Sequence, residues 1–291
     1  MIRLTVRVRR EQAELVLAEL LELAPAGVEE ADAGEHVEYA VYGAPGELPS
    51  LPELRVAAGS ALVEVTTTEV ADDWQERWRR FHRPVVIPRP AGPGRRVPAL
   101  VVRPPWEQPT EAGGPVEEIV IDPGQAFGTG AHASTRLCLE LLLELAAQTP
   151  APGSLLDVGT GSGVLAIAAA RLGFAPVVGV DSDRASVQAT RSNATVNCVR
   201  VTALGLDLRR EALPAAGGVA GGWGVVTANL LLPLLCELAD VLRPAPAHLI
   251  AGGLLAGQAR EVVSNFSQQL GLRERARRTS GEWQALWLSL P

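Results

Sequence analysis

The stretch from Ser154 to Asp181 constrains the fold of this chain more than any other. An apolar run over 155–158 enters the glycine-rich turn 159–163, and an alanine-rich helical pattern follows at once. A strand that leaves such a turn directly as a helix brings the backbone close to a ligand at the carboxyl end of a central parallel strand. Asp181 ends the next apolar strand, where a carboxylate can accept hydrogen bonds from both hydroxyls of a ribose. The stretch therefore predicts an α/β domain that binds a nucleoside-bearing cofactor.

Two classes of cofactor fit such a site, and the spacing favours S-adenosylmethionine over a dinucleotide. Dinucleotide sites prefer Gly-x-Gly-x-x-Gly, in which backbone amides cradle a pyrophosphate. Here the pattern is Gly-x-Gly-x-Gly, and Asp157 precedes it. A carboxylate at that point repels pyrophosphate but can hold the cationic methionine moiety, directly or through water. A tight turn without a ligand is the third alternative, and Asp181 argues against it. We therefore predict an S-adenosylmethionine site that includes Asp157, Gly159, Gly161 and Asp181.

The C-terminal part predicts a Rossmann-like α/β domain over residues 118–291. Apolar strands alternate there with helices, which is typical of a parallel sheet covered on both faces. Strands are expected over 155–158, 177–180, 199–204, 224–228 and 248–251, and helices over 134–147, 163–172, 183–196, 231–242 and 256–270. Two further strand-like runs, 273–279 and 283–289, predict a closing antiparallel hairpin.

The N-terminal part predicts a separate small α+β domain over residues 1–67, because 291 residues exceed what one hydrophobic core usually serves. The expected order of elements is ferredoxin-like: strand 2–9, helix 11–23, strands 28–31 and 35–42, helix 51–58 and strand 61–67. Residues 68–117 are expected to form a linker, with a helix over 72–82 followed by a loop-rich junction dense in proline and glycine. Trp74, Trp78 and Phe81 share one face of that helix, which is more often a packing face than a partner-binding stripe.

Charge and composition limit the function classes. The net charge is −7 and there is no lysine, so the chain is a poor generic nucleic-acid binder; the charge fits either a basic partner or plain solubility. No apolar run reaches the roughly 18 residues of a spanning helix, and the N-terminus lacks the pattern of a signal peptide. Cys138, Cys198 and Cys236 have no metal-ligand spacing and are expected to be buried thiols. We expect a monomeric cytoplasmic protein without a metal.

Two more motifs are expected to converge on the glycine-rich turn. Residues 122–135 form a glycine-rich loop carrying Phe127, which is expected to fold over the cofactor as a lid, with Phe127 packed either on the donor or within the lid. Asn229 ends a strand where a transferable group would lie. His132 is either a catalytic base or a structural hydrogen-bonding residue, the commoner role in such a loop. Asp207 either meets the adenine amino group or is a surface acid.

These motifs resemble those of the ribosomal protein L11 methyltransferase family, PrmA. The resemblance rests on 123–130, His132, Thr135, 159–163, Asp181, 228–231, 252–255, Gln258, 281–283, Trp74 and Trp78. It implies a seven-stranded class I S-adenosylmethionine methyltransferase domain, a mobile linker and an N-terminal domain that recognises the ribosomal protein. It also implies that Thr135, Gly159, Asp181 and Asn229 bind the donor. The chain departs from the family pattern at the long Pro-rich stretch 88–115 and at Ala133-Ser134, where Pro-Thr is more typical.

The implied reaction is methyl transfer to α-amino and lysine ε-amino groups of ribosomal protein L11. Asn229 is then the catalytic residue, because its side-chain carbonyl could hold the attacking amine. Leu230 and Leu231 follow it where related amino-group methyltransferases often have an aromatic wall, which suggests a roomier pocket. Two other classes stay open: an RNA or small-molecule methyltransferase, and a non-catalytic assembly factor that binds S-adenosylmethionine.

Overall fold

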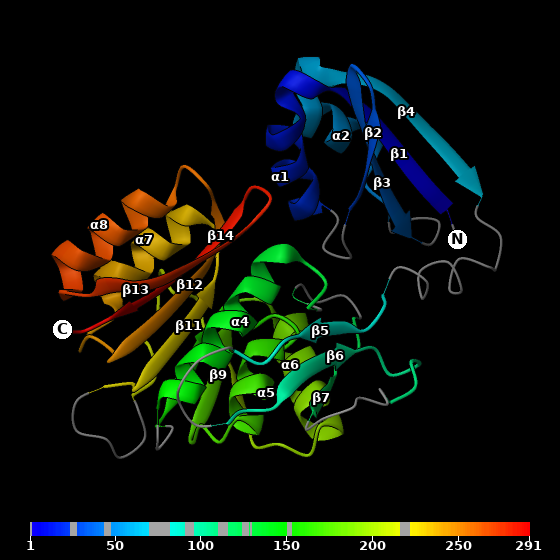
Figure 1. Cartoon of the computed structure of the whole chain (residues 1–291). Coiled ribbons are helices and arrows are strands. Elements are labelled where there is room, and N and C mark those ends of the chain that lie inside the picture. Colours follow the sequence, from blue (N-terminus) through cyan, green and yellow to red (C-terminus); the bar gives the residue numbers. More distant parts are fainter. Residues whose placement is uncertain are drawn as a thin grey trace. The chain divides into compact units, whose positions relative to one another are not determined.

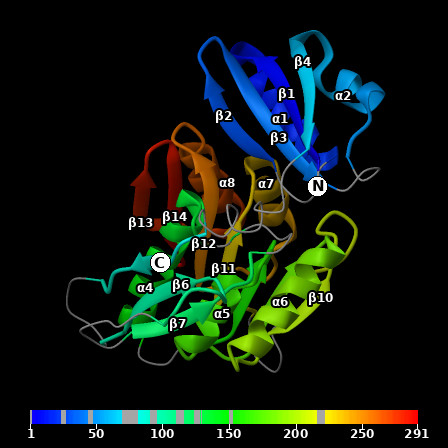
Figure 2. The ribbon, with the colours of Figure 1, turned by 90° about the vertical axis from the view of Figure 1, so that its right-hand side faces the viewer.

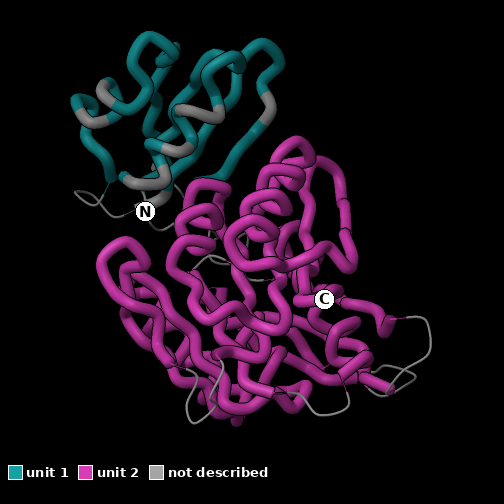
Figure 3. Tube along the Cα trace, turned by 90° about the vertical axis from the view of Figure 1, so that its left-hand side faces the viewer, with its two compact units in different colours: residues 1–81 teal, residues 82–291 magenta. Residues whose placement is uncertain are grey.

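The chain forms two compact units, Met1–Phe81 and His82–Pro291, which are coloured separately in Figure 3. The computed structural model describes residues 2–23, 28–43, 48–69, 82–90, 96–109, 116–123, 128, 130–149, 153–215 and 222–291. Each unit has a sheet and a hydrophobic core of its own.

The first unit is a four-stranded antiparallel sheet with two helices packed on one face. Its elements are β1 (Ile2–Arg9), α1 (Ala13–Leu23), β2 (Glu29–Ala33), β3 (His36–Gly43), α2 (Leu51–Ala58) and β4 (Leu62–Glu69), with single 3-10 turns at Arg10–Gln12 and Gly59–Ala61. The strands lie in the order β2-β3-β1-β4 (Figure 1). Leu4, Val6 and Val8 alternate along β1 and so face the same side, where they form a core with Leu20 of α1 and Leu54 of α2.

The second unit contains a seven-stranded, mostly parallel sheet, as the sequence predicts. Its strands are β8 (Leu155–Val158), β9 (Val177–Asp181), β10 (Thr202–Gly205), β11 (Val225–Asn229), β12 (His248–Leu255), β13 (Arg273–Ser280) and β14 (Trp283–Ser289). They lie in the order β10-β9-β8-β11-β12-β14-β13. The first five are parallel, and β14 is antiparallel to both neighbours, so the predicted closing hairpin is confirmed. The strand order reverses between β8 and β11, the place where such sheets bind ligands.

Helices cover both faces of this sheet. They are α4 (Ala133–Gln148), α5 (Val164–Arg171), α6 (Arg184–Val196), α7 (Leu232–Val241) and α8 (Ala259–Leu270). The first three share one buried cluster with the sheet, and α7 and α8 share another on the opposite face. All five predicted helices are confirmed, with ends shifted by three residues at most.

The junction predicted over 83–117 as loop-rich also contains three short strands, which the sequence does not predict. They are β5 (Val85–Ile87), β6 (Ala99–Arg103) and β7 (Val116–Val120), paired in the order β5-β6-β7. This small sheet lies across α4 and α5 (Figure 2), and Ile87, Leu100 and Ile119 are fully buried in the same cluster as those helices. The prolines fall between the strands rather than within them, since proline cannot donate to a sheet ladder. Apart from His82, the helix predicted over 72–82, with Trp74, Trp78 and Phe81, lies outside the described residues.

Three expectations drawn from composition can be compared with the structure. Cys138 is buried and Cys236 is half-buried, but Cys198 is exposed, because it follows the end of α6 in a turn with φ of 53°. None of the helices in the described ranges is long and apolar enough to cross a membrane. The described residues hold no group of three or more His, Cys, Asp or Glu side chains placed to bind a metal ion.

Candidate functional site

The glycine-rich turn between β8 and α5 wraps over the end of β9. The amides of Gly159 and Thr160 both donate to the carbonyl of Val180, at 2.9 and 3.0 Å. Gly159 and Gly163 have φ of 72° and 84°, which disfavours any residue with a Cβ atom. A Cβ at Gly159 would also overlap Cδ2 of Leu230. The spacing of the glycines therefore follows from the left-handed backbone and from the leucine packed against the turn.

Asp157 lies beneath this turn and holds it to two strands. Its side chain is 1% exposed, and its oxygens accept hydrogen bonds from the hydroxyls of Thr160, at 2.8 Å, and Thr227, at 2.7 Å. Burial raises the pKa of Asp157 to about 6, although these two hydrogen bonds favour the ionised form. This environment leaves the carboxylate engaged inside the protein, where it fixes the backbone of the turn.

Asp181 stands at the end of β9 and contacts the same turn from its open side. One oxygen accepts from the amide of Gly161 and the other from that of Asp183, both at 3.0 Å. The residue is half-buried, and burial raises the pKa of its carboxyl. Each carboxylate oxygen has a second lone pair, so both can still accept a hydroxyl proton. The structure thus brings Asp157, Gly159, Gly161 and Asp181 together around one turn.

Asn229 and Thr135 meet at the carboxyl end of β11, the strand next to β8. The Asn229 Nδ2 donates to Thr135 Oγ1 at 3.2 Å, and Thr135 itself is 1% exposed in the first turn of α4. Oδ1 of Asn229 is buried and has no hydrogen-bond partner among the described residues. A buried acceptor without a donor costs about 1–3 kcal/mol. This oxygen therefore fits an N–H group that arrives with a ligand.

Two leucines border Asn229 in different ways. Leu230 packs between the turn and β12, since a Cβ at Gly159 would overlap its side chain and one at Gly253 would lie 2.5 Å from its carbonyl oxygen. Leu231 is the N-cap residue just before α7 and is 65% exposed, which is unusual for a large apolar side chain. The residue after Asn229 thus packs against the glycine-rich turn and β12, and the next one presents an exposed apolar side chain.

His132 makes the contacts of a structural residue. It precedes α4, its Nδ1 accepts from the amide of Ser134 at 3.3 Å, and it lies 2.8 Å from the Ser134 hydroxyl oxygen. Its ring also meets that of Trp283 edge-on, with centroids 4.6 Å apart, and burial lowers its pKa. These contacts favour the structural role over that of a base. Phe127, with residues 124–126 and 129 of the predicted lid, lies outside the described residues.

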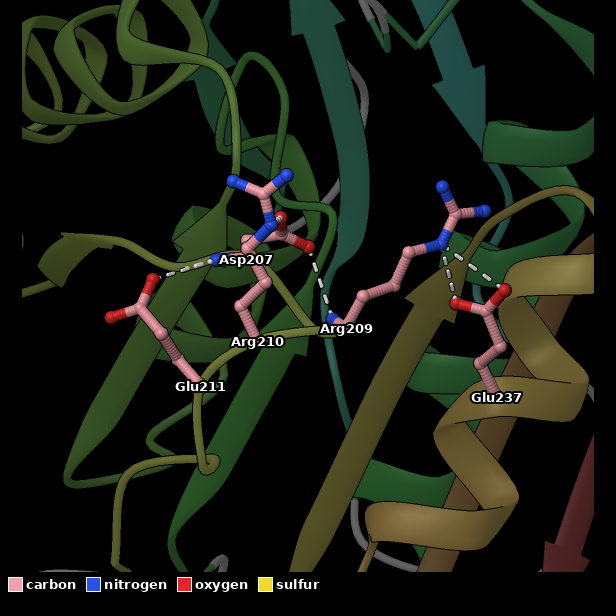
Figure 4. A network of polar contacts seen from close by, with 5 residues as sticks. All are labelled: Asp207, Arg209, Arg210, Glu211 and Glu237. Atoms are coloured by element: carbon pink, nitrogen blue, oxygen red, sulfur yellow. Dashed lines mark hydrogen bonds and ion pairs between the residues drawn. The ribbon is translucent and has the colours of Figure 1, made fainter.

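Asp207 belongs to a polar network on the surface beyond β10, which Figure 4 shows. Its carboxylate accepts from the amide of Arg209 at 3.0 Å and pairs with Arg210 at 3.3 Å, and its own amide donates to Glu211. Arg209 in turn donates to both oxygens of Glu237 on α7. These local contacts favour the interpretation of Asp207 as a surface acid.

The helix α6 supplies buried polar residues that the motif analysis missed. Thr190 Oγ1 donates to the carbonyl of Gly161 at 2.9 Å, and Asn193 Nδ2 donates to that of Ser162 at 2.8 Å. The hydroxyl of Ser162 donates to the carbonyl of Gly128 at 2.6 Å. A sequence signal for them exists: Ser186, Thr190, Asn193 and Asn197 follow each other at helical spacing, which makes one face of the helix polar.

Comparison with known proteins gives a consistent answer. The model of the family described as "Ribosomal protein L11 methyltransferase (PrmA)" matches residues 50–290. A ribosomal protein L11 methyltransferase of Syntrophotalea carbinolica is 38% identical over 235 residues, which cover 77% of this chain and 70% of the relative. One of Geobacter sulfurreducens is 39% identical over 233 residues, covering 78% and 70%. The crystal structure of a ribosomal protein L11 methylase from Lactobacillus delbrueckii subsp. bulgaricus superposes with a TM-score of 0.58 at 26% identity, over 72% of this chain and 98% of that one.

Proposed function

Because this chain belongs to the ribosomal protein L11 methyltransferase family, we propose that it methylates α-amino and lysine ε-amino groups of ribosomal protein L11. Family membership makes it an S-adenosylmethionine-dependent methyltransferase. The observation that carries the proposal is the buried Asn229 Oδ1, which has no partner among the described residues and stands at the end of the strand beside the glycine-rich turn.

The turn and the end of β9 form the donor side of this proposed site. Asp181 accepts the ribose hydroxyls with its remaining lone pairs, and its bond to the amide of Gly161 keeps the carboxylate against the turn. Gly159 lets the backbone approach the nucleoside closely, and Asp157 holds the turn from below through Thr160 and Thr227. When bound, the donor supplies a sulfonium methyl group that is intrinsically electrophilic. These residues bind and orient, which is most of what such a reaction requires of a protein.

Asn229 is the proposed acceptor residue. Thr135 holds its Nδ2, so the carbonyl oxygen stays available to accept an N–H of the incoming amine and to direct the nitrogen lone pair at the methyl carbon. Asn229 would thus hold the attacking nitrogen, and the bound donor would supply the methyl group and take up the electron pair of its carbon–sulfur bond. The amine must be neutral to attack. An α-amino group has a pKa near 7.7–8.0, whereas neutralising a lysine with a pKa near 10.4 costs about 4.6 kcal/mol at pH 7.

The unit Met1–Phe81 is the proposed recognition domain for the ribosomal protein. Its support is an independent sheet and core, and an element order that suits the implied ferredoxin-like domain. The family match begins at residue 50, so this role rests on the resemblance and on that architecture. A cytoplasmic location, a monomeric state and the absence of direct nucleic-acid binding complete the proposal, and the acidic charge of −7 supports the last of these.

A methyl-transfer assay tests this function. The chain is incubated with radiolabelled S-adenosylmethionine and either ribosomal protein L11 or ribosomal RNA, and modified residues are mapped by mass spectrometry. We expect label on amino groups of the protein, and none with Asp181→Ala, which loses the proposed ribose contact. Label on RNA alone would show that the chain is an RNA methyltransferase. Donor binding without label on either substrate would favour an assembly factor.

A further inference from the structure

Two buried asparagines lie one turn apart at the C-terminal end of α6, Asn193 within the helix and Asn197 just after its last residue, and they make different sets of contacts. Asn193 is 3% exposed and Asn197 is 2% exposed. Buried side-chain amides are retained when their hydrogen-bonding groups are satisfied, and the partners that satisfy them show what they hold together. Both asparagines face the small sheet and its following segment, so they form a natural pair for comparison.

Asn197 holds the strand β7. Its Oδ1 accepts from the amide of Val120 at 2.8 Å, and its Nδ2 donates to the carbonyl of the same residue at 2.6 Å. The side chain thus offers β7 the two bonds that a neighbouring strand would make. A third bond returns to the carbonyl of Asn193 within α6. Among the described residues, the hydrogen bonds of the Asn197 side chain thus tie β7 to the end of α6 and do not reach the glycine-rich turn.

Asn193 instead joins two loops of the site. Its Nδ2 donates to the carbonyl of Ser162, within the glycine-rich turn, and its Oδ1 accepts from the amide of Asp122 at 3.1 Å. Asp122 is the second residue of the segment that leads from β7 to α4. A second bond links the same two loops, because Ser162 Oγ donates to the carbonyl of Gly128. The far end of this segment is α4, whose Thr135 holds Asn229.

We propose that Asn193 is a positioning residue. It fixes the glycine-rich turn 159–163, on the donor side of the site, relative to the segment 121–132, which leads to α4 and so to the residue that holds Asn229. This inference rests on the proposed function, because it assigns the turn to the donor and Asn229 to the acceptor. Both polar groups of the Asn193 side chain bond to the protein backbone, so its proposed effect on the ligands is indirect. Asn193 acts by bonding both the carbonyl of Ser162 and the amide of Asp122. The turn that contains Ser162 also bonds to Asp181, and the segment that contains Asp122 is followed by α4, which contains Thr135.

The test compares Asn193→Leu with Asn197→Leu in the full chain. Both substitutions remove buried hydrogen bonds from the same face of α6, so both should lower the melting temperature by several degrees. Only Asn193→Leu should weaken S-adenosylhomocysteine binding, measured by titration calorimetry, by about tenfold or more. It should also raise the KM for the donor more than it lowers kcat, whereas Asn197→Leu should keep the donor affinity within about twofold of the unsubstituted chain.

The outcomes distinguish a failure of the role proposed for Asn193 from a failure of the proposed function. Equal donor affinity in the two variants, whether weakened or unchanged, would overturn the positioning role of Asn193. If Asn193→Leu does not fold, Asn193→Ala removes the same hydrogen bonds without placing extra apolar atoms in the gap, and the same comparison decides. Failure of the unsubstituted chain to bind S-adenosylhomocysteine would instead contradict the proposed function.

Discussion

The two sides of the proposed site differ in how completely the protein satisfies its own polar groups. On the donor side, both oxygens of Asp157 and of Asp181 already accept hydrogen bonds from the chain. On the acceptor side, Asn229 Oδ1 finds no partner in the described ranges, and Leu231 leaves 65% of its surface exposed. The donor side is thus built in advance, whereas the acceptor side keeps a polar and an apolar group available for what arrives.

This difference assigns separate tasks to the two sides. A preorganised binding surface needs little rearrangement, so changes there should appear in donor affinity and in stability. A group that meets its partner only when the acceptor is present should affect turnover and leave the folded chain intact. Four substitutions test this division, and the size of the expected effect decreases from the first to the last.

Asn229→Ala should lower turnover far more than it weakens donor binding. Loss of one preorganised hydrogen-bonding group typically lowers kcat about 100- to 1000-fold. Methyl transfer to ribosomal protein L11 and calorimetric titration of S-adenosylhomocysteine measure the two quantities. Asn265→Ala is a matched control, because Asn265 on α8 also has a buried Oδ1 without a partner in the described part of the chain. Unchanged kcat in Asn229→Ala, or an equal loss in the control, would remove Asn229 from catalysis.

Asp157→Asn should change how stability depends on pH. Burial raises the pKa of Asp157 from 3.8 to about 6, so its protonated form stabilises the folded chain; that stabilisation is complete below about pH 3.8 and is lost as the pH rises through 6. At about 1.36 kcal/mol per pKa unit, the ionised group costs about 3 kcal/mol at neutral pH. Urea unfolding at about pH 4.5 and about pH 7.5 should show the variant gaining stability relative to the unsubstituted chain at the higher pH. A difference that is independent of pH would show that this carboxyl has an ordinary pKa.

Gly159→Ala should lower both donor affinity and stability, because it distorts the backbone of the glycine-rich turn. A φ of 72° costs a residue with a Cβ about 1–2 kcal/mol, and the new atom would overlap Leu230. We expect the free energy of unfolding to fall by about 2 kcal/mol and donor affinity to fall about tenfold. Gly205→Ala is the control, since no described atom lies within 4 Å of a Cβ there and its φ is not positive. Equal effects in both variants would mean that the geometry of the turn is not what matters.

Asp207→Ala should have the smallest effect. The carboxylate of Asp207 is occupied by the amide of Arg209 and by Arg210 on the surface, so we expect donor affinity to stay within about twofold. Calorimetric titration of S-adenosylhomocysteine measures it. A loss of tenfold or more would extend the donor side to the end of β10 and assign Asp207 to the adenine.

The sequence predicts the centre of the parallel sheet well because strands such as β8 and β11 are buried on both faces and end at sharp turns. The predicted strand over 155–158 coincides with β8, since the glycine-rich turn follows it immediately. The prediction is poorer for β10, expected over 199–204 and found at Thr202–Gly205, because Val199 and Val201 pack against the core without joining the strand. An apolar pattern indicates that side chains are buried, but a buried residue need not be hydrogen-bonded into a sheet.

The candidate site divides along a similar line. Asp181 and Asn229 could be proposed from the sequence because both end parallel strands, whose carboxyl ends meet at one edge of the sheet. The small sheet and the roles of Asn193 and Asn197 could not be predicted from the sequence, because both depend on contacts between segments that are distant in the chain. A three-residue strand such as β5 has too short a pattern, and a polar face on a helix is normally a solvated one. The bond from Asn193 to Ser162 becomes visible only when the loops are brought together.

The position of β14 has a consequence for how the catalytic sheet is completed during synthesis. This strand follows β13 along the chain but lies between β12 and β13 in the sheet. A nascent chain therefore produces the edge strand before the strand that joins it to the rest. Leu286 and Trp287 of β14 also enter the clusters on opposite faces of the sheet. Neither hydrophobic core is whole until this strand has left the ribosome, so the donor turn and Asn229 are made long before the sheet that supports them can close.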